Sequence, residues 1–133
     1  MLGLRPSDIY LDVATGISEF PEVVHDLVGC PCWRQDLSYR PGLHDDFIGG
    51  SAAHIPMPNG SVTRMALHNS FEHFEGDTDR ACIREAARLL APNGRLCIVP
   101  LFLREDFVNL SDGWLSRGVQ FDAQARRILD TRF

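Results

Sequence analysis

The sequence predicts an α/β domain with a mostly parallel sheet of about five strands and helices on its flanks. Apolar segments of strand length alternate along the chain with two segments in which apolar residues recur at helical spacing. The last of the strand segments, residues 95–103, is almost entirely apolar, as expected of a parallel strand buried on both faces. The 133 residues favour one domain over 1–133, with a core at 8–103 and a C-terminal extension at 104–133.

The N-terminal part of the chain predicts a strand followed by a helix. Residues 8–14, DIYLDVA, are expected to form a buried strand. A helix is expected over 18–29, because apolar residues recur there every three or four positions. Ser18 is the expected N-cap, Pro21 is tolerated in the first turn, and Gly29 suits the end of the helix.

The next part of the chain predicts two short strands that are joined without a helix. A weaker strand is expected to end at Asp36. Residues 39–46, YRPGLHDD, are expected to form a turn-rich bridge, too short and too broken for a full helix. A third short strand falls within 47–52, and residues 54–62 form a loop with two prolines and an Asn-Gly turn.

The second half of the chain predicts a strand, a helix and a strand. Residues 62–70 are the fourth strand, 77–94 hold the clearest helix, which the sequence PNG at 92–94 is expected to stop, and 95–103 are the fifth strand. In the tail, residues 118–121 are expected to form a short strand and the end of the chain a helix-like piece. Loops that follow parallel strands meet at one edge of a sheet, where ligands bind. The loops expected at that edge are 14–18, 36–38, 50–53 and 68–73.

Composition and charge indicate a globular protein that does not bind nucleic acid. Hydrophobic residues make up 44% and charged residues 23% of the chain, and the formal net charge of -5 disfavours contact with phosphates. No segment of about 18 apolar residues could span a membrane. The four cysteines are too few for a disulfide scaffold, so we expect free thiols and a cytoplasmic location.

The segment YLDVATGISEF, residues 10–20, runs from strand to helix through a loop with a single glycine. A strand, a tight loop and a helix form the architecture that cradles nucleotide cofactors, but such loops usually carry two or three glycines. From the residues alone, the segment is either a cofactor loop that has lost glycines or an ordinary turn.

Five segments, taken in order, resemble class I S-adenosylmethionine-dependent methyltransferases with a type 11-like methyltransferase domain. They are LDVATGIS, QDLSYRPGL, GGSAAHIPMPNGSV, LHNSFEHF and REAARLLAPNGRLCIVPL, and the resemblance covers about residues 8–103. It implies a Rossmann-like fold that is apparently truncated at the C-terminal end, and therefore a short or incomplete version of that fold. It also implies S-adenosyl-L-methionine as cofactor and S-adenosyl-L-homocysteine as product.

The resemblance implies cofactor-binding residues in the loops at the sheet edge. The first loop of the family has an acid and then three glycines at alternate positions; here the acid is Asp12, and Gly16 is the glycine that is kept. Asp36 matches the acid that binds the ribose hydroxyls, although it could instead be a turn-initiating aspartate. Ser51 stands where the family often has an adenine-binding aspartate. The expected cofactor-binding residues are Asp12, Ala14, Thr15, Gly16, Asp36, Leu37, Ser51, Ala52 and Asn69.

The resemblance also places the methyl group and the substrate beside the segment LHNSFEHF. A base is needed only when the nucleophile arrives protonated, as hydroxyls do. The candidates are His68, Glu72 and His73, and each could instead be a polar residue with a structural hydrogen bond. The extra carboxylate of metal-assisted relatives would fall at Asn69, so no metal is expected.

The expected function is methyl transfer from S-adenosyl-L-methionine to a small-molecule or sugar-like acceptor. The alternative is a non-catalytic methyltransferase-like binding or assembly module that has lost part of the cofactor site. A nicotinamide-dinucleotide domain is a weaker alternative, because it would have a fuller glycine fingerprint. Besides the substrate, we expect a second copy of the chain or a partner domain to cover the truncated sheet edge, and neither nucleic acid nor a membrane as partner.

Overall fold

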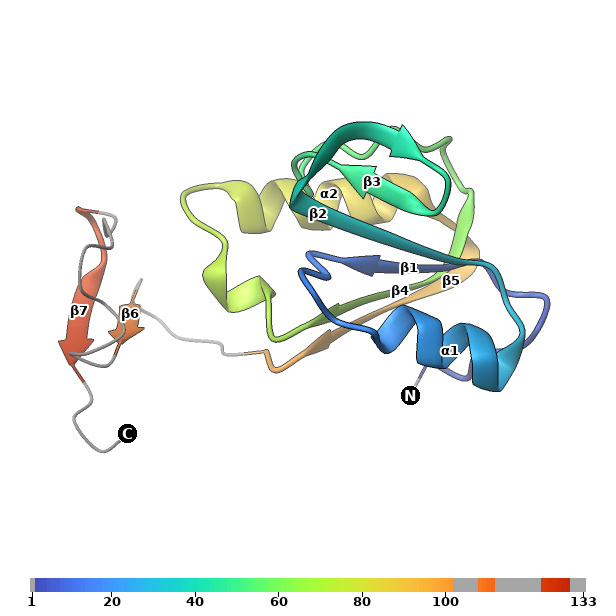
Figure 1. Cartoon of the computed structure of the whole chain (residues 1–133). Helices are drawn as coiled ribbons and strands as arrows, with labels where there is room; N and C mark the ends of the chain where they lie inside the picture. The colour runs from blue at the N-terminus through green and yellow to red at the C-terminus, as the bar shows by residue number, and fades with distance from the viewer. Residues whose placement is uncertain (1, 102–107, 112–122, 130–133) are drawn as a thin grey trace. The chain divides into compact units, whose positions relative to one another are not determined.

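The computed structural model describes residues 2–101, 108–111 and 123–129. The chain divides into two units, Met1–Leu101 and Phe102–Phe133. The first unit holds a five-stranded sheet with helices on its faces (Figure 1). No described helix of the protein is long and apolar enough to cross a membrane.

The second unit contains two short strands, β6 (Val108–Ser111) and β7 (Arg126–Leu129), which pair in parallel. The expectation of a helix-like piece at the end of the chain is therefore wrong at 126–129, because β6 offers these residues a neighbouring backbone for hydrogen bonding. The strand expected at 118–121 lies outside the described residues.

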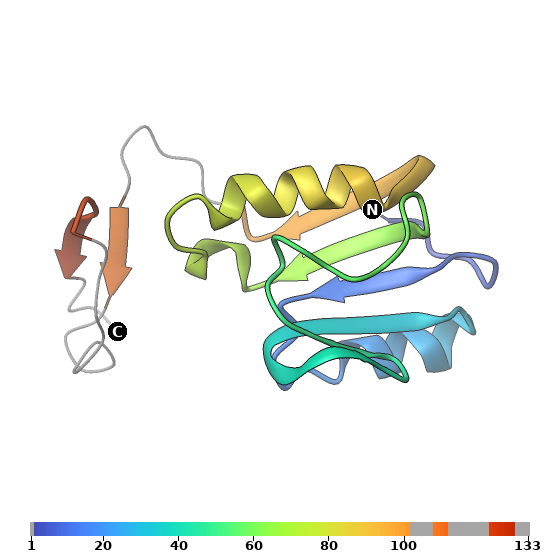
Figure 2. The ribbon, with the colours of Figure 1, turned by 90° about the horizontal axis from the view of Figure 1, so that it is seen from above.

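The sheet of the first unit has the strand order β3-β2-β1-β4-β5, with neighbouring strands paired in parallel (Figure 2). The prediction of a mostly parallel sheet of five strands is confirmed. The chain order reverses at β1, which has β2 on one side and β4 on the other, so the topological switch point lies at the end of β1. The strands are β1 Tyr10–Val13, β2 Cys32–His44, β3 Phe47–Gly49, β4 Val62–His68 and β5 Leu90–Val99.

Helices α1 and α2 cover opposite faces of this sheet (Figure 1). Successive residues of β1 point to opposite faces, so Leu11 and Val13 pack in the cluster that contains α2 residues, whereas Tyr10 packs with Val24 of α1. Burial on both faces explains why this strand is almost entirely apolar in sequence. The helices are α1 Phe20–Val28, the short 3-10 helix η1 Phe71–His73, and α2 Thr78–Leu89.

The start of α1 differs by one residue from the expectation. The N-cap is Glu19, which makes no side-chain capping bond, so the prediction of Ser18 as N-cap is wrong. The Ser18 hydroxyl instead accepts a hydrogen bond from the Phe20 N–H at 3.2 Å, within the turn before the helix. The places of Pro21 and Gly29 are confirmed: Pro21 lies in the first turn, and Gly29 ends the helix in the left-handed conformation with φ 75°.

The expected end of the second strand at Asp36 and the expected loop at 36–38 are wrong, because β2 continues to His44. The expected bridge at 39–46 is wrong over residues 39–44 for the same reason. They pair with β3 in the opposite sense to the first half of the strand, and the pairing ends with His44 beside Phe47. Gly49 permits this close approach, because a Cβ atom there would overlap the backbone carbonyl of Arg40.

The boundary between α2 and β5 falls earlier than expected, since the helix ends at Leu89 and the strand begins at Leu90. The helix is expected to stop at PNG, residues 92–94, and it ends two residues before that stop. Pro92 accounts for the difference, because its ring disfavours helical backbone at Ala91 and it has no N–H to continue the helix.

Candidate functional site

Three segments meet at the carboxyl edge of the sheet, as the sequence predicts for a parallel arrangement. The loop after β1 is joined to β2 by a hydrogen bond of 2.8 Å from the Gly16 N–H to Asp36 Oδ2. The loop after β3 is joined to the same residue, because the Gly50 N–H donates to the Asp36 carbonyl at 3.1 Å. Asp36 thus lies between the first and third loops.

Gln35 is the residue that sequence reasoning missed. Its side chain is 1% exposed, and its amide oxygen accepts a hydrogen bond from the Ala14 N–H at 3.2 Å while its amide nitrogen donates to the Gly50 carbonyl. Its backbone carbonyl also accepts from the Thr15 N–H at 3.0 Å. The available signal was a glutamine directly before the strand-end acid, at a position where a buried strand would otherwise be apolar.

Asp36 is held in its ionised form by local donors. Its Oδ1 accepts hydrogen bonds from the Ser38 N–H at 2.8 Å and the Ser38 hydroxyl at 2.6 Å. Burial raises the pKa of Asp36, but the donors on Ser38 and Gly16 outweigh that effect and hold the pKa below its usual value. Nearby, the Tyr39 hydroxyl donates to the Gly16 carbonyl at 2.6 Å, so the loop after β1 is fixed from two directions.

The loop after β1 adopts a conformation typical of glycine. Ala14 has φ 54° and Gly16 has φ 58°, both in the left-handed region. No atom lies within 4 Å of the place where a Cβ on Gly16 would stand, so this side of the loop is open. Thr15 is buried. Its hydroxyl donates to the Asp12 carbonyl at 2.9 Å, so the Thr15 side chain points back toward the end of β1.

Asp12 and His68 are brought together by neighbouring strands. Asp12 is 2% exposed, and its Oδ1 lies 3.3 Å from His68 Nδ1. Burial raises the pKa of Asp12 to about 6, against the opposing effects of His68 and Arg34. The imidazole of His68 also packs against Phe20 at the start of α1, with ring centroids 4.6 Å apart and an edge-to-face angle of 61°.

The remaining expected cofactor-binding residues occupy different settings. Leu37 is 76% exposed next to Asp36, and Ala52 is buried in the core. The exposed Ser51 hydroxyl accepts a hydrogen bond from the Ala53 N–H at 3.2 Å. Asn69 follows β4 with φ 49°, and its N–H donates to the Val99 carbonyl at 2.8 Å.

The structure does not bring the three expected catalytic residues into contact with one another. His68 is paired with Asp12, whereas Glu72 and His73 lie on η1 with exposed side chains. Within the described part of the chain, no group of three or more His, Cys, Asp or Glu side chains is arranged to hold a metal ion.

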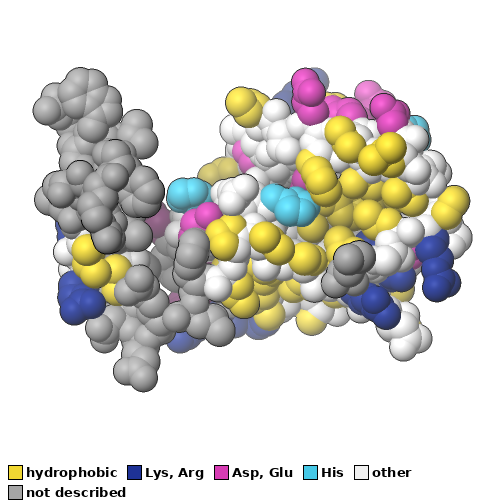
Figure 3. Space-filling model, turned by 90° about the horizontal axis from the view of Figure 1, so that it is seen from below, with side chains coloured by type: hydrophobic (Ala, Val, Ile, Leu, Met, Phe, Trp, Pro, Cys, Tyr) yellow, Lys and Arg dark blue, Asp and Glu magenta, His cyan; other side chains and the backbone are white. Residues whose placement is uncertain are grey.

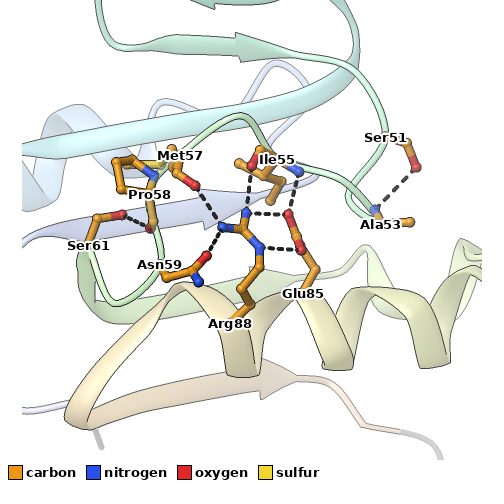
Figure 4. Close-up of polar contacts among 9 residues, drawn as sticks. All are labelled: Ser51, Ala53, Ile55, Met57, Pro58, Asn59, Ser61, Glu85 and Arg88. Atoms are coloured by element: carbon orange, nitrogen blue, oxygen red, sulfur yellow. Dashed lines mark hydrogen bonds and ion pairs between the residues drawn. The ribbon is translucent and has the colours of Figure 1, made fainter.

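The loop between β3 and β4 is anchored to α2 by an ion pair (Figure 4). Glu85 is 7% exposed; its Oε1 accepts from the Ile55 N–H at 2.6 Å and from the Arg88 guanidinium at 2.7 Å. The Arg88 guanidinium also donates to the carbonyls of Ile55 and Met57, each at 2.8 Å, and to the side chain of Asn59 at 2.7 Å. This clamp fixes residues 55–59 of the loop.

Comparison with known families matches this chain to the family described as "Methyltransferase domain", over residues 11–98. The matched range contains helices α1 and α2 and strands β2, β3 and β4 in full, and all but one residue each of β1 and β5. Among curated protein sequences, none is significantly similar to this chain.

Several solved structures share the fold. YcgJ from Bacillus subtilis has a TM-score of 0.62 and 21% identity over 73% of this chain and 45% of its own. A chain of the complex between the Haloferax volcanii Trm112 methyltransferase activator and a methyltransferase has a TM-score of 0.59 and 21% identity over 72% of this chain and 46% of its own. Geranyl diphosphate C-methyltransferase from Streptomyces coelicolor, solved with S-adenosyl-L-homocysteine, has a TM-score of 0.58 and 19% identity over 71% of this chain and 38% of its own. The present chain therefore spans less than half the length of each of these proteins.

Proposed function

Because the chain belongs to the methyltransferase-domain family, we propose that it binds S-adenosyl-L-methionine at the carboxyl edge of its sheet and transfers a methyl group to a small-molecule or sugar-like acceptor. The observation that carries the proposal is the junction at Asp36, where the loops after β1 and β3 are both joined to β2 by hydrogen bonds. A ligand laid across this junction would contact all three segments at the topological switch point.

The residues at this edge fit such a cofactor. A carboxylate has about four lone-pair sites, and Asp36 has three of them filled by Gly16 and Ser38. One ribose hydroxyl can therefore use the remaining site, and a second can replace the Ser38 hydroxyl. The open side of Gly16 leaves room for the methionine part. Leu37 offers an exposed apolar surface to the adenine, and Ser51 offers a hydroxyl.

The bound cofactor would supply an electrophilic methyl group on a sulfonium, so the protein's task is mainly alignment. Gln35 holds the loops after β1 and β3 at a fixed separation, and the charge of Asp36 is kept by its own donors. The structure of the Streptomyces relative with S-adenosyl-L-homocysteine supports this choice of cofactor. On the acceptor side, the candidates for a base are His68, Glu72 and His73.

The test is a calorimetric titration of S-adenosyl-L-homocysteine into the intact protein and into Asp36→Ala. We expect binding in the micromolar range for the intact protein and an affinity lower by about tenfold to a hundredfold for the variant, because hydrogen bonds to a charged group are worth about 1.5–3 kcal/mol. Asp26→Ala, on the exposed side of α1, is the matched control and should bind as the parent does. Thermal unfolding of each protein shows whether the variant remains folded.

Absence of binding by the folded parent would contradict the proposal. The non-catalytic binding or assembly module would then be the better description. Equal affinity of Asp36→Ala and the parent would contradict the role given to Asp36 while leaving the cofactor in place. Stabilisation by NAD but not by S-adenosyl-L-homocysteine would favour the nicotinamide-dinucleotide alternative.

We also propose that a second copy of the chain covers the outer edge of β5. The Haloferax relative is described in a complex with the activator Trm112, which supports a protein partner of some kind for this fold. On the α1 side of the first unit, apolar side chains gather at the surface (Figure 3). All four cysteines of the chain are free thiols, which supports a cytoplasmic location.

A further inference from the structure

We infer that Asp12 and His68 act together as the base that removes the proton from a hydroxyl group of the methyl acceptor. The inference rests on the proposed function and makes it more specific, since it assigns the acceptor to the alcohols or phenols. It depends on three features: the position of the pair on the sheet, the difference in burial between its members, and the charges around it.

The sheet register places both side chains on one face. Asp12 of β1 lies beside Ala66 of β4, and His68 is two residues farther along β4, so its side chain points to the same face as that of Ala66. His68 Nδ1 is 3.3 Å from Asp12 Oδ1. The ring of Phe20 packs against the imidazole at 4.6 Å between centroids, so a second contact holds the ring in place.

The two side chains differ in their access to solvent. The side chain of Asp12 is 2% exposed and that of His68 is 31% exposed. An ionised carboxylate can only accept hydrogen bonds, so Asp12 favours the tautomer of His68 in which Nδ1 carries the proton. The lone pair is then on Nε2, the ring nitrogen that the carboxylate leaves uncommitted.

The charges around the pair determine the pH above which the Asp12 carboxyl is ionised and can orient His68. Burial raises the pKa of Asp12 to about 6, while His68 from β4 and Arg34 from β2 act in the opposite direction. Arg34 is itself paired with Glu22 of α1 and with Asp46. The other titratable groups that feel the charge of Asp12 are Tyr10, Cys32 and Tyr39. Asp12 therefore becomes a charged partner for His68 as the pH rises through about 6.

The chemistry of the acceptor follows from the presence of a base. An amine can attack with its own lone pair, whereas a hydroxyl is a poor nucleophile until its proton is removed. In the balanced step, the acceptor O–H bond breaks and its proton goes to Nε2 of His68. The oxygen forms a bond to the methyl carbon as the carbon–sulfur bond breaks, and the electron pair of that bond stays on sulfur. The proton on His68 then passes to water.

The first test uses NMR of protein labelled with ¹⁵N at histidine and needs no acceptor. The His68 signals are assigned by their loss in His68→Gln. We expect the tautomer protonated at Nδ1 at pH 8, and loss of this preference in Asp12→Asn. A His68 ring protonated at Nε2, or a ring whose signals do not change in Asp12→Asn, would overturn the inference.

The second test measures methyl transfer to alcohols and phenols and to amines of the same carbon skeleton. We expect transfer to the hydroxyl compounds, a rate that rises through about pH 6, and a loss of about a hundredfold or more in His68→Gln. His44→Gln, at a half-buried position in β2, is the control and should retain the parental rate. Transfer to amines alone, or a His68→Gln rate close to that of the parent, would overturn the inference.

The titration of S-adenosyl-L-homocysteine separates this inference from the proposed function. His68→Gln is expected to keep the parental affinity for S-adenosyl-L-homocysteine within about twofold, because Asp36 and not His68 is proposed to hold the cofactor. If the parent fails to bind S-adenosyl-L-homocysteine, the proposed function is wrong. If it binds but the NMR signals show no link between His68 and Asp12, only the inference about the base is wrong.

Discussion

At the scale of single residues, Asp12 places a carboxyl group where solvent scarcely reaches it. Burial raises its pKa from 3.8 to about 6 in the folded protein. The folded state therefore binds the proton more tightly than the unfolded chain does. The resulting contribution to stability is complete below about pH 4 and is lost as the pH rises through about 6.

We expect Asp12→Asn to be more stable than the parent at pH 8, because asparagine keeps the shape of the side chain without its charge. From pH 5 to pH 8, the difference in unfolding free energy should grow in favour of the variant by about 1.4 kcal/mol. Urea denaturation at the two pH values measures it. Asp26→Asn, at an exposed position, is the control, and its difference from the parent in unfolding free energy should be the same at pH 5 and pH 8. A difference for Asp12→Asn that does not change with pH would contradict the expectation.

The sequence could predict the place of Asp36 but not Gln35. Asp36 is expected at the end of a strand; the structure continues β2 to His44 but still puts Asp36 at the meeting point of the loops after β1 and β3. The role of Gln35 depends on the separation of the loops after β1 and β3, which is fixed only when β1, β2 and β3 are in register. Likewise, the contact between Asp12 and His68 joins residues 56 positions apart and depends on the pairing of β1 with β4.

At the scale of elements, the ion pair of Glu85 and Arg88 fixes a long loop to α2. We expect Arg88→Ala to lower the unfolding free energy by about 3 kcal/mol, because it leaves Glu85 buried without its cation and removes donors from two loop carbonyls. Urea denaturation at neutral pH measures the loss. Arg84→Ala, on the exposed face of the same helix, should change stability by less than about 0.5 kcal/mol. Equal losses in both variants would show that the clamp has no special role.

Element type was easier to predict from the sequence than element boundaries. The buried strands and the two amphipathic helices are each marked by many apolar residues, and the structure confirms them. Boundaries depend on a few local contacts. The early end of α2 follows from Pro92, and the extension of β2 through 39–44 depends on pairing with β3, which no local pattern reveals.

At the scale of the whole molecule, the edge of the sheet formed by β5 bears on association with another chain. Among the described residues, β5 pairs on one side only, with β4. Val99 at its end is 52% exposed, and α1 carries the exposed apolar side chains of Phe20, Val23 and Leu27. Figure 3 shows apolar side chains gathered at the surface on the α1 side of the first unit. An unpaired apolar edge tends to associate with another chain.

We expect the protein to sediment as a dimer at micromolar concentration, and Val99→Lys to sediment as a monomer. A lysine at an exposed strand end should disturb edge pairing without unfolding the protein. Ile83→Lys, at a position 41% exposed on α2, is the matched control and should remain a dimer. A monomeric parent over the micromolar range would contradict the proposed second copy.

The side chain of Gln35 has a consequence for the thermodynamics of ligand capture. Loops that surround a ligand often lose motion when it arrives, and that loss weakens affinity. Here the amide hydrogens of Ala14 and Thr15 and the carbonyl of Gly50 are already bonded to one buried residue. These loops therefore become ordered when the chain folds. A ligand that binds at this edge would not have to order them, and its affinity would not be reduced by their loss of conformational entropy.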